Sequence, residues 1–160
     1  MKRSIGAIGL GLMGKLMCKN LLKAGYHLVV LKRSKAAVYE VVAAGATAVD
    51  TPKAVAEQAQ FIITMLPNSP NLKALILGEN GIIEGAEPGT VVIDMNSIAP
   101  LVSKAICTEL ETIGVEMLNA PVSGGEPKAG VEPELVYEAV RGGLAGSTVL
   151  DAKAPLVMAA

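Results

Sequence analysis

Short apolar runs alternate with longer amphipathic segments along most of the chain. Runs rich in Val, Ile and Leu, bounded by turn residues, predict six strands near 5–8, 27–31, 46–49, 61–66, 90–94 and 115–119. Apolar residues at helical spacing predict intervening helices near 12–24, 36–44, 52–58, 72–77 and 98–113. This alternation predicts an α/β fold with a Rossmann-type, doubly wound parallel sheet.

A glycine fingerprint joins the first predicted strand to the first predicted helix. Gly9-Leu10-Gly11-Leu12-Met13-Gly14 fits the pattern G-x-G-x-x-G. Gly9 permits the tight turn, Gly11 lets a pyrophosphate approach the backbone, and Gly14 lets the helix pack close to the sheet. Free N–H groups at the start of the helix attract such an anion. The strand–helix context favours a dinucleotide site over a glycine-rich turn without a ligand.

The end of the second predicted strand indicates which dinucleotide binds. A site for NAD places Asp or Glu there to accept from the ribose 2′-hydroxyl, at an offset of about 20 residues from the glycines. This chain has Lys32, Arg33 and Ser34 instead. Two cations and a hydroxyl suit a 2′-phosphate, so we expect NADP(H), with NAD(H) as the alternative. A solvated basic turn without a ligand would have the same composition.

Three further loops follow predicted strands and should meet at the carboxyl edge of the sheet, where Rossmann ligands lie. The first is 67–70, in which Asn68 and Ser69 could equally cap the next helix. The second is 95–97, and the third is 120–125. Backbone N–H groups of Gly124 and Gly125 in the third loop could hold a carboxylate.

Composition excludes several classes of protein. Hydrophobic residues make up 51% and charged residues 18%, which is typical of a globular chain. A net charge of −1 and an aromatic content of 2% argue against nucleic-acid or membrane-surface binding. We expect no metal site, no signal peptide and no transmembrane helix. Cys18 and Cys107 are expected to be buried thiols, which predicts a cytosolic protein.

The alternation of strand and helix patterns ends near Lys128. Two short helices are predicted at 133–140 and 147–158, too little for a second domain. We therefore divide the chain into a nucleotide-binding domain at 1–128 and a short helical segment at 129–160.

Three stretches together resemble the β-hydroxyacid dehydrogenase family, which includes 3-hydroxyisobutyrate dehydrogenase. They are 8–14 with Asn20-Leu21, Asp94-Met95-Asn96-Ser97, and Ala120-Pro121-Val122-Ser123-Gly124-Gly125. Within the family, the tartronate semialdehyde reductase (2-hydroxy-3-oxopropionate reductase) branch looks nearest, on the stretches 64–70, 78–85, 124–129 and 141–147.

The resemblance implies an NAD(P)H-dependent reduction of a small 3-oxo acid, and hence a small carboxylate as partner. It also implies two sets of contacts. The coenzyme would contact the loop from Gly9 to Gly14, Arg33, Leu66, Pro67, Asn68 and Ser97. The substrate carboxylate would contact Ser123, Gly124 and Gly125. Formation of a homo-oligomer stays open.

The chain also departs from the family. The family's general acid is a lysine in a G-x-x-x-K-x-x-x-N helix motif, and no stretch of this sequence fits that motif. The resemblance suggests an internal shortening near Lys128, with 129–160 as a remnant of the family's all-helical C-terminal domain. The catalytic residue is therefore unassigned. Lys128 and Lys153 are candidates by position only, and solvated surface lysines are the simpler interpretation.

Two alternatives to an active reductase stay open. One is a remnant that binds coenzyme but is catalytically impaired, and the other is an unstable truncation product with exposed apolar helix faces. Smaller departures are Asn96, where the family favours Ser, and Lys32, where NAD-preferring relatives place an acid.

Overall fold

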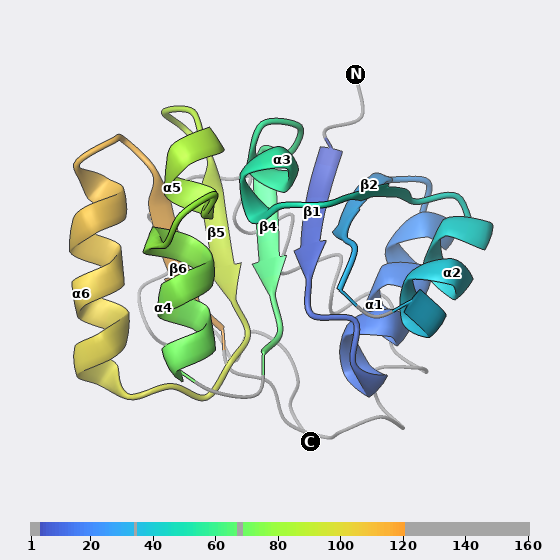
Figure 1. The fold of residues 1–160 in the computed structure, drawn as a ribbon, viewed down its shortest axis with the longest axis horizontal. Coiled ribbons are helices and arrows are strands. Elements are labelled where there is room, and N and C mark those ends of the chain that lie inside the picture. Colours follow the sequence, from blue (N-terminus) through green and yellow to red (C-terminus); the bar gives the residue numbers. More distant parts are fainter. Residues whose placement is uncertain (1–3, 34, 67–68, 121–160) are drawn as a thin grey trace.

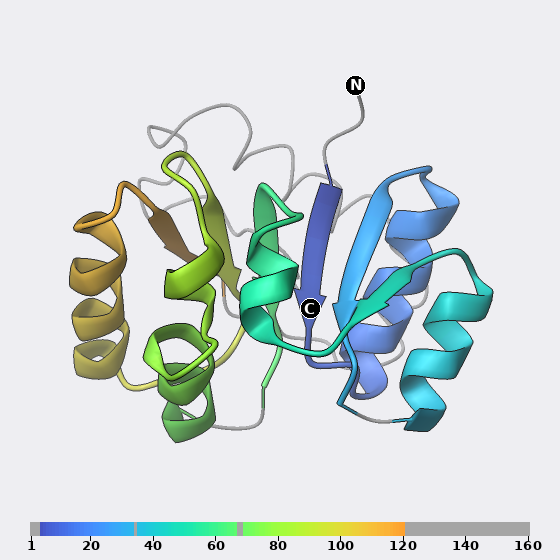
Figure 2. The same ribbon diagram turned by 45° about the horizontal axis from the view of Figure 1, so that its top comes forward.

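A single parallel sheet forms the centre of the molecule. The computed structural model describes residues 4–33, 35–66 and 69–120. In these ranges the strands are β1 (Ser4–Ile8), β2 (His27–Leu31), β3 (Thr47–Val49), β4 (Phe61–Thr64), β5 (Val91–Asp94) and β6 (Glu116–Asn119). They pair in the order β3-β2-β1-β4-β5-β6, and Figure 2 shows them side by side. The doubly wound Rossmann-type sheet predicted from the sequence is confirmed.

Helices connect the strands and cover both faces of the sheet. They are α1 (Leu12–Lys23), α2 (Lys35–Ala43), α3 (Pro52–Ala56), α4 (Ser69–Leu77), α5 (Ile82–Gly85) and α6 (Pro100–Glu111). In Figure 1, α3, α4 and α5 lie in front of the strands. Each connection returns the chain to the start of a parallel strand, as a crossover must.

Two apolar clusters hold the layers together. On one face, Met17, Cys18 and Leu21 of α1 pack with strand residues such as Ile5 and Val30. On the other face, residues of α3, α4, α5 and α6 pack against Ile8, Ile62 and Val92. The central strands β1 and β4 are therefore buried on both sides, which explains their continuous apolar runs.

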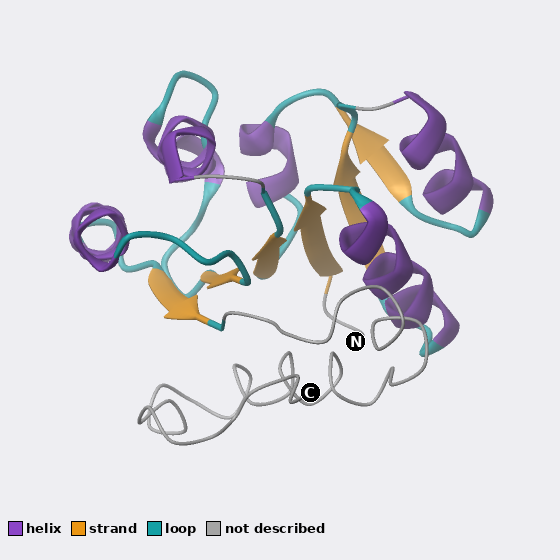
Figure 3. Ribbon diagram, turned by 90° about the horizontal axis from the view of Figure 1, so that it is seen from below, coloured by secondary structure: helices purple, strands orange, loops and turns teal. Residues whose placement is uncertain are grey.

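The strands end together at one edge of the sheet. In the register of the ladder, Ile8 pairs with Thr64, Thr64 with Asp94, and Asp94 with Asn119. The loops that follow these residues leave from the same edge, which faces the viewer in Figure 3. This carboxyl edge is where ligands of open α/β sheets bind.

The element boundaries differ from the sequence prediction in instructive places. Thr51 caps α3 as expected, accepting from the N–H of Ala54 at 3.1 Å, but the helix ends at Ala56 rather than at residue 58. The strand predicted to reach Leu66 ends at Thr64, where the chain leaves the ladder toward α4. The short α5 was not predicted, because its four residues lie among glycines and carry little periodicity.

Some sequence predictions concern residues outside the described ranges. These are the helices at 133–140 and 147–158, together with the segment 129–160 as a whole. Within the described residues, no helix is long and apolar enough to cross a membrane, and no cluster of His, Cys, Asp and Glu could hold a metal ion. Both cysteines are free thiols, and Cys18 is buried as expected. The prediction of a buried thiol is wrong for Cys107, which is partly exposed on α6.

Candidate dinucleotide site

The turn between β1 and α1 requires glycine at two positions for steric reasons. Gly9 has a φ of +104°, and a Cβ on it would lie 1.9 Å from the carbonyl oxygen of Met65. A Cβ on Gly14 would lie 1.8 Å from the carbonyl oxygen of Gly9. Both clashes are with backbone, so a side chain cannot be accommodated by rotation of a neighbour. Gly9 and Gly14 therefore serve the fold, by letting α1 approach the end of β1 closely.

Gly11 differs from the other two glycines of the fingerprint. A Cβ built on Gly11 would meet no atom of the described residues beyond its chain neighbours within 4 Å, and its φ of −68° suits any residue. Gly11 is the N-cap of α1 and offers no side chain to the free N–H groups of the first turn. The space above it is thus open and lies at the positive end of a 12-residue helix. This is the arrangement that a pyrophosphate requires.

The end of β2 carries the charges that the sequence analysis predicted to meet the adenosine ribose. Lys32 and Arg33 are both exposed, directly after the last residue of β2. The ammonium of Lys32 lies 3.5 Å from the carboxylate of Asp50, which follows β3. The site thus holds two cations, as the sequence predicted, and also one carboxylate that it did not predict.

A side-chain network joins the ends of β4 and β5. Thr64 donates from Oγ1 to Oδ1 of Asp94 at 2.9 Å, and the backbone N–H of Asn96 donates to the same oxygen at 3.2 Å. The amide Nδ2 of Asn96 donates to this oxygen as well, and its Oδ1 accepts from the N–H of Leu66. These four residues are buried. Asn96 therefore connects the segment that follows β5 to the segment that follows β4.

The second oxygen of the Asp94 carboxyl has no hydrogen-bond partner among the described residues. Burial raises the pKa of Asp94 above its usual value, while the hydrogen bonds from Thr64 and Asn96 oppose the rise. The folded chain therefore favours the neutral acid relative to an exposed aspartate. Asp94 is fully buried, and its hydrogen bonds support the segments that follow β4 and β5.

The structure brings most of the predicted coenzyme residues to one edge. Leu10 is half-buried against the core, Leu12 is 66% exposed, and Met13 is partly exposed at the start of α1. Leu66 is buried after β4 and Ser97 is exposed after β5. Together with Gly9, Gly11, Gly14, Lys32 and Arg33 they follow the ends of neighbouring strands.

The remaining predicted site residues lie outside the described ranges. For the coenzyme these are Ser34, Pro67 and Asn68. For the substrate carboxylate they are Ser123, Gly124 and Gly125. Lys128 and Lys153, the positional candidates for a proton donor, also lie there. Their roles stay predictions.

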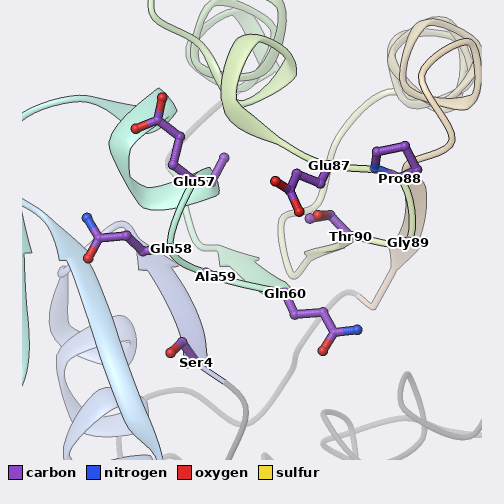
Figure 4. Close-up of a pocket in the computed structure, with 10 residues that line it drawn as sticks. Ser4, Glu57, Gln58, Ala59, Gln60, Glu87, Pro88, Gly89 and Thr90 are labelled. Atoms are coloured by element: carbon purple, nitrogen blue, oxygen red, sulfur yellow. The ribbon is translucent and has the colours of Figure 1, made fainter.

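A depression also lies at the amino edge of the sheet. It has a volume of about 380 Å³ and is lined by Ser4, 56–60 and 87–90. Figure 4 shows the side chains of Glu57, Gln58 and Gln60 pointing in different directions, without converging on a common point. A ligand site needs a few convergent polar groups, so this depression is not the functional site. It is at the edge opposite to the glycine turn.

Sequence reasoning missed two features of the site. The first is the network of Thr64, Asp94 and Asn96, and the second is the carboxylate of Asp50. A signal for the network existed, because Thr64 and Asp94 are polar residues within otherwise apolar strands. The partner of Lys32 could not be found, because the pairing of β2 with β3 brings Asp50 near only in space.

Comparison with known proteins places these features in a family context. A family model described as the NAD binding domain of 6-phosphogluconate dehydrogenase matches residues 4–136. The mitochondrial 3-hydroxyisobutyrate dehydrogenase of Bos taurus is 44% identical over 124 residues, which cover 78% of this chain and 37% of that enzyme. The 2-hydroxy-3-oxopropionate reductase of Escherichia coli K12 is 38% identical over 122 residues, covering 76% of this chain and 41% of that enzyme.

A solved structure agrees with these sequence matches. The 3-hydroxyisobutyrate dehydrogenase of Mycobacterium tuberculosis, solved with L-serine, superposes with a TM-score of 0.78 at 25% identity. The superposition covers 99% of this chain and 54% of that one. The resemblance to β-hydroxyacid dehydrogenases is thus confirmed, and the chain spans less than half of each curated relative described above.

Proposed function

The chain belongs to the family of the NAD-binding domain of 6-phosphogluconate dehydrogenase, and we propose that it binds NADP(H) at the glycine turn to reduce a small 3-oxo acid. The proposed substrate class is that of tartronate semialdehyde, reduced to a hydroxy acid of the glycerate type. A 3-hydroxyisobutyrate-type substrate is the related alternative, since enzymes of both kinds are similar to this chain.

The open space above Gly11 is the observation that carries the coenzyme proposal. The fold itself explains Gly9 and Gly14, whose Cβ atoms would clash with backbone. It does not explain Gly11, where alanine would fit and would cost less conformational entropy on folding. A ligand that needs the Cβ space accounts for the glycine. The free N–H groups of α1 around this space suit a pyrophosphate.

The preference for NADP(H) rests on the charges after β2. Arg33 forms no ion pair with a described residue and can direct its guanidinium to a phosphate. Neither Lys32 nor Arg33 could accept a hydrogen bond from a free ribose 2′-hydroxyl. These side chains therefore support a 2′-phosphate better than a hydroxyl.

Each part of the site has a separate task in the proposed reaction. The coenzyme, when bound, supplies the hydride that reduces the aldehyde carbon. The glycine turn holds the pyrophosphate, and the loops joined by Asn96 hold the end of the coenzyme beyond it. Ser123, Gly124 and Gly125 are proposed to hold the substrate carboxylate. A proton donor must act beside the developing alkoxide, typically worth about 10²–10⁴-fold in rate, and Lys128 and Lys153 are the candidates.

Coenzyme binding without efficient turnover is the second candidate function. It is favoured by the absence of a G-x-x-x-K-x-x-x-N pattern from these 160 residues. In this case the nucleotide-binding unit 1–128 would keep its affinity, and the segment 129–160 would add little to the chemistry.

One titration separates these functions. The purified chain is titrated with NADPH and with NADH by coenzyme fluorescence, and tartronate semialdehyde is then added to the same sample. Binding followed by NADPH oxidation supports the reductase. Binding without oxidation supports the second candidate. If neither coenzyme binds, the proposed site is wrong.

Gly11→Val tests the site itself. We expect this variant to lose NADPH binding while its unfolding midpoint stays near that of the wild type, because the valine enters only open space. Ala24→Val is the matched control, since it adds a similar side chain at the other end of α1, roughly 20 Å away. Unchanged NADPH affinity in Gly11→Val would exclude a pyrophosphate from this turn.

We also propose that the protein works in the cytosol. Both cysteines are free thiols, which suits a reducing compartment. Fractionation of cells that express the tagged chain tests this location. Recovery of the chain in another compartment would contradict it.

A further inference from the structure

Lys32 follows β2 and Asp50 follows β3, and the pairing of these strands brings the two residues together. Leu31 pairs with Val49 in the ladder between β2 and β3, and the N–H of Lys32 donates to the carbonyl of Val49 at 2.8 Å. The next residue after Val49 is Asp50. The Lys32 ammonium then lies 3.5 Å from the Asp50 carboxylate. The backbone register thus places an acid beside the cation that the sequence offers to the ribose.

This arrangement changes the charge of the site. Counted from the sequence alone, the turn after β2 has two positive side chains, Lys32 and Arg33. In the folded chain Asp50 partly neutralises Lys32, whereas Arg33 has no ionic partner among the described residues. The side chains of Lys32 and Asp50 are 56% and 80% exposed, so both remain available to respond to a ligand.

We propose that Asp50 is a determinant of coenzyme preference. Its ion pair holds Lys32 toward β3 and so weakens the preference for NADP(H) over NAD(H). Arg33 is then the main cation for the 2′-phosphate, and Lys32 contributes less because it is paired with Asp50. This inference rests on the proposed binding of NADP(H) at this edge, and it assigns a role to a residue outside the glycine turn and the β2 loop.

Electrostatics gives the direction of the effect. A phosphate monoester carries a charge of about −1.5 to −2 at neutral pH, whereas the 2′-hydroxyl of NAD(H) is neutral. A Lys32 ammonium paired with Asp50 attracts a 2′-phosphate less strongly than an unpaired ammonium does, whereas the neutral 2′-hydroxyl responds little to the charge of Lys32. The pair is exposed, and exposed ion pairs are worth up to about 1 kcal/mol, so removing Asp50 should change the affinity ratio by about threefold to fivefold.

The test compares dissociation constants of NADPH and NADH for the wild type and four variants of the full chain. Asp50→Asn removes the charge and keeps the shape, and Asp50→Glu restores the charge. Lys32→Gln removes the partner, and Lys32→Gln with Asp50→Asn completes a double-mutant cycle.

Glu116→Gln is the control for net charge. It removes one negative charge from the first residue of β6, at the amino edge. β6 lies four strands away from β2, roughly 19 Å at the usual strand spacing and about two Debye lengths at physiological salt. Its affinity ratio should match that of the wild type.

We expect Asp50→Asn to raise the ratio of the NADH to the NADPH dissociation constant, mainly through tighter NADPH binding. Asp50→Glu should keep the wild-type ratio. In the Lys32→Gln background the effect of Asp50→Asn should be much smaller, because Asp50 acts through Lys32. An unchanged or lowered ratio in Asp50→Asn would overturn the inference. An equal effect with and without Lys32 would also overturn it.

The wild-type measurement separates this inference from the proposed function. A wild type that binds NADH more tightly, or neither coenzyme, contradicts the proposed preference itself. A wild type that prefers NADPH, with an Asp50→Asn ratio equal to its own, contradicts only the role of Asp50.

Discussion

Thr64 donates a hydrogen bond to Oδ1 of Asp94 across 2.9 Å, joining the last residues of β4 and β5. The same oxygen accepts from the backbone and the side chain of Asn96, which in turn accepts from the N–H of Leu66. Beyond Thr64 and Asp94 the two segments of the chain diverge, one toward α4 and the other toward α6. One buried carboxyl oxygen therefore organises the loops just where the regular ladder ends.

Removing this carboxyl should cost considerable stability. In Asp94→Ala, buried donors of Thr64 and Asn96 lose their acceptor, and we expect the free energy of unfolding to fall by about 2–4 kcal/mol. Asp94→Asn keeps an acceptor oxygen in place and should cost less. Urea unfolding followed by circular dichroism gives both values. Equal stability of Asp94→Ala and the wild type would contradict the role assigned to this network.

The stability of the chain should depend on pH through Asp94. Burial raises the pKa of its carboxyl in the folded state, so the folded chain holds this proton more tightly than the unfolded chain does. Its stabilising contribution is therefore complete below the unfolded pKa of about 3.9, and it is lost as the pH rises through the folded pKa.

Asp94→Asn isolates this effect, because the amide does not titrate and all other groups are shared. The free energy of unfolding of the wild type minus that of Asp94→Asn should decrease as the pH is raised from about 4 toward neutrality. If the difference in free energy is constant or increases with pH, burial does not disfavour the ionised form of Asp94.

Asn96 should matter for coenzyme affinity as well as for stability. Asn96→Ala removes the bond to the N–H of Leu66 and so separates the two loops. We expect a stability loss of about 1 kcal/mol and a several-fold rise in the NADPH dissociation constant. Ser103→Ala is the control, because it removes a bond of 2.8 Å to Asn119 that joins α6 to β6 instead. If both variants weaken NADPH binding equally, the effect is not specific to the loops.

Gly14 should be intolerant of substitution for a reason unrelated to the ligand. A methyl group on Gly14 would lie 1.8 Å from the carbonyl oxygen of Gly9, so Gly14→Ala must displace the backbone of the turn. We expect its unfolding midpoint to fall markedly without coenzyme, whereas Gly11→Ala should match or slightly exceed the wild type. Equal stability of the two alanine variants would contradict the packing seen at the turn.

The sequence was informative where a local pattern determines the structure. Periodicity located the six strands of the described residues, and the fingerprint placed Gly9, Gly11 and Gly14 where β1 passes into α1. Thr51 was identifiable as a cap because Pro52 follows it at the first helical position.

Features that depend on the pairing of distant segments could not be predicted in this way. Asp50 reaches Lys32 only because β3 pairs with β2, and Asn96 reaches Leu66 only because β5 pairs with β4. The sequence also could not show that Gly11 alone among the three glycines has open space at its Cβ position. That distinction depends on the path of the turn and on the position of the Met65 carbonyl beside it.

The two cysteines should differ in reactivity, because the fold encloses only one of them. Cys18 is a buried residue in the middle of α1, and burial raises the pKa of its thiol to about 12. The pKa of Cys107 is also raised, by burial and by the nearby Glu111, but its side chain is partly exposed. A thiolate is the reactive species, so a buried thiol with a high pKa is inert.

We therefore expect a maleimide reagent to modify Cys107 first in the native chain, and Cys18 only at the rate of unfolding. Mass spectrometry of peptides after timed labelling, with and without urea, measures both rates. In Cys107→Ser the first phase should disappear while the slow phase is unchanged. Modification of Cys18 as fast as that of Cys107 in native conditions would mean that α1 opens readily. In that case the packing of α1 against the end of β1 would not persist in solution.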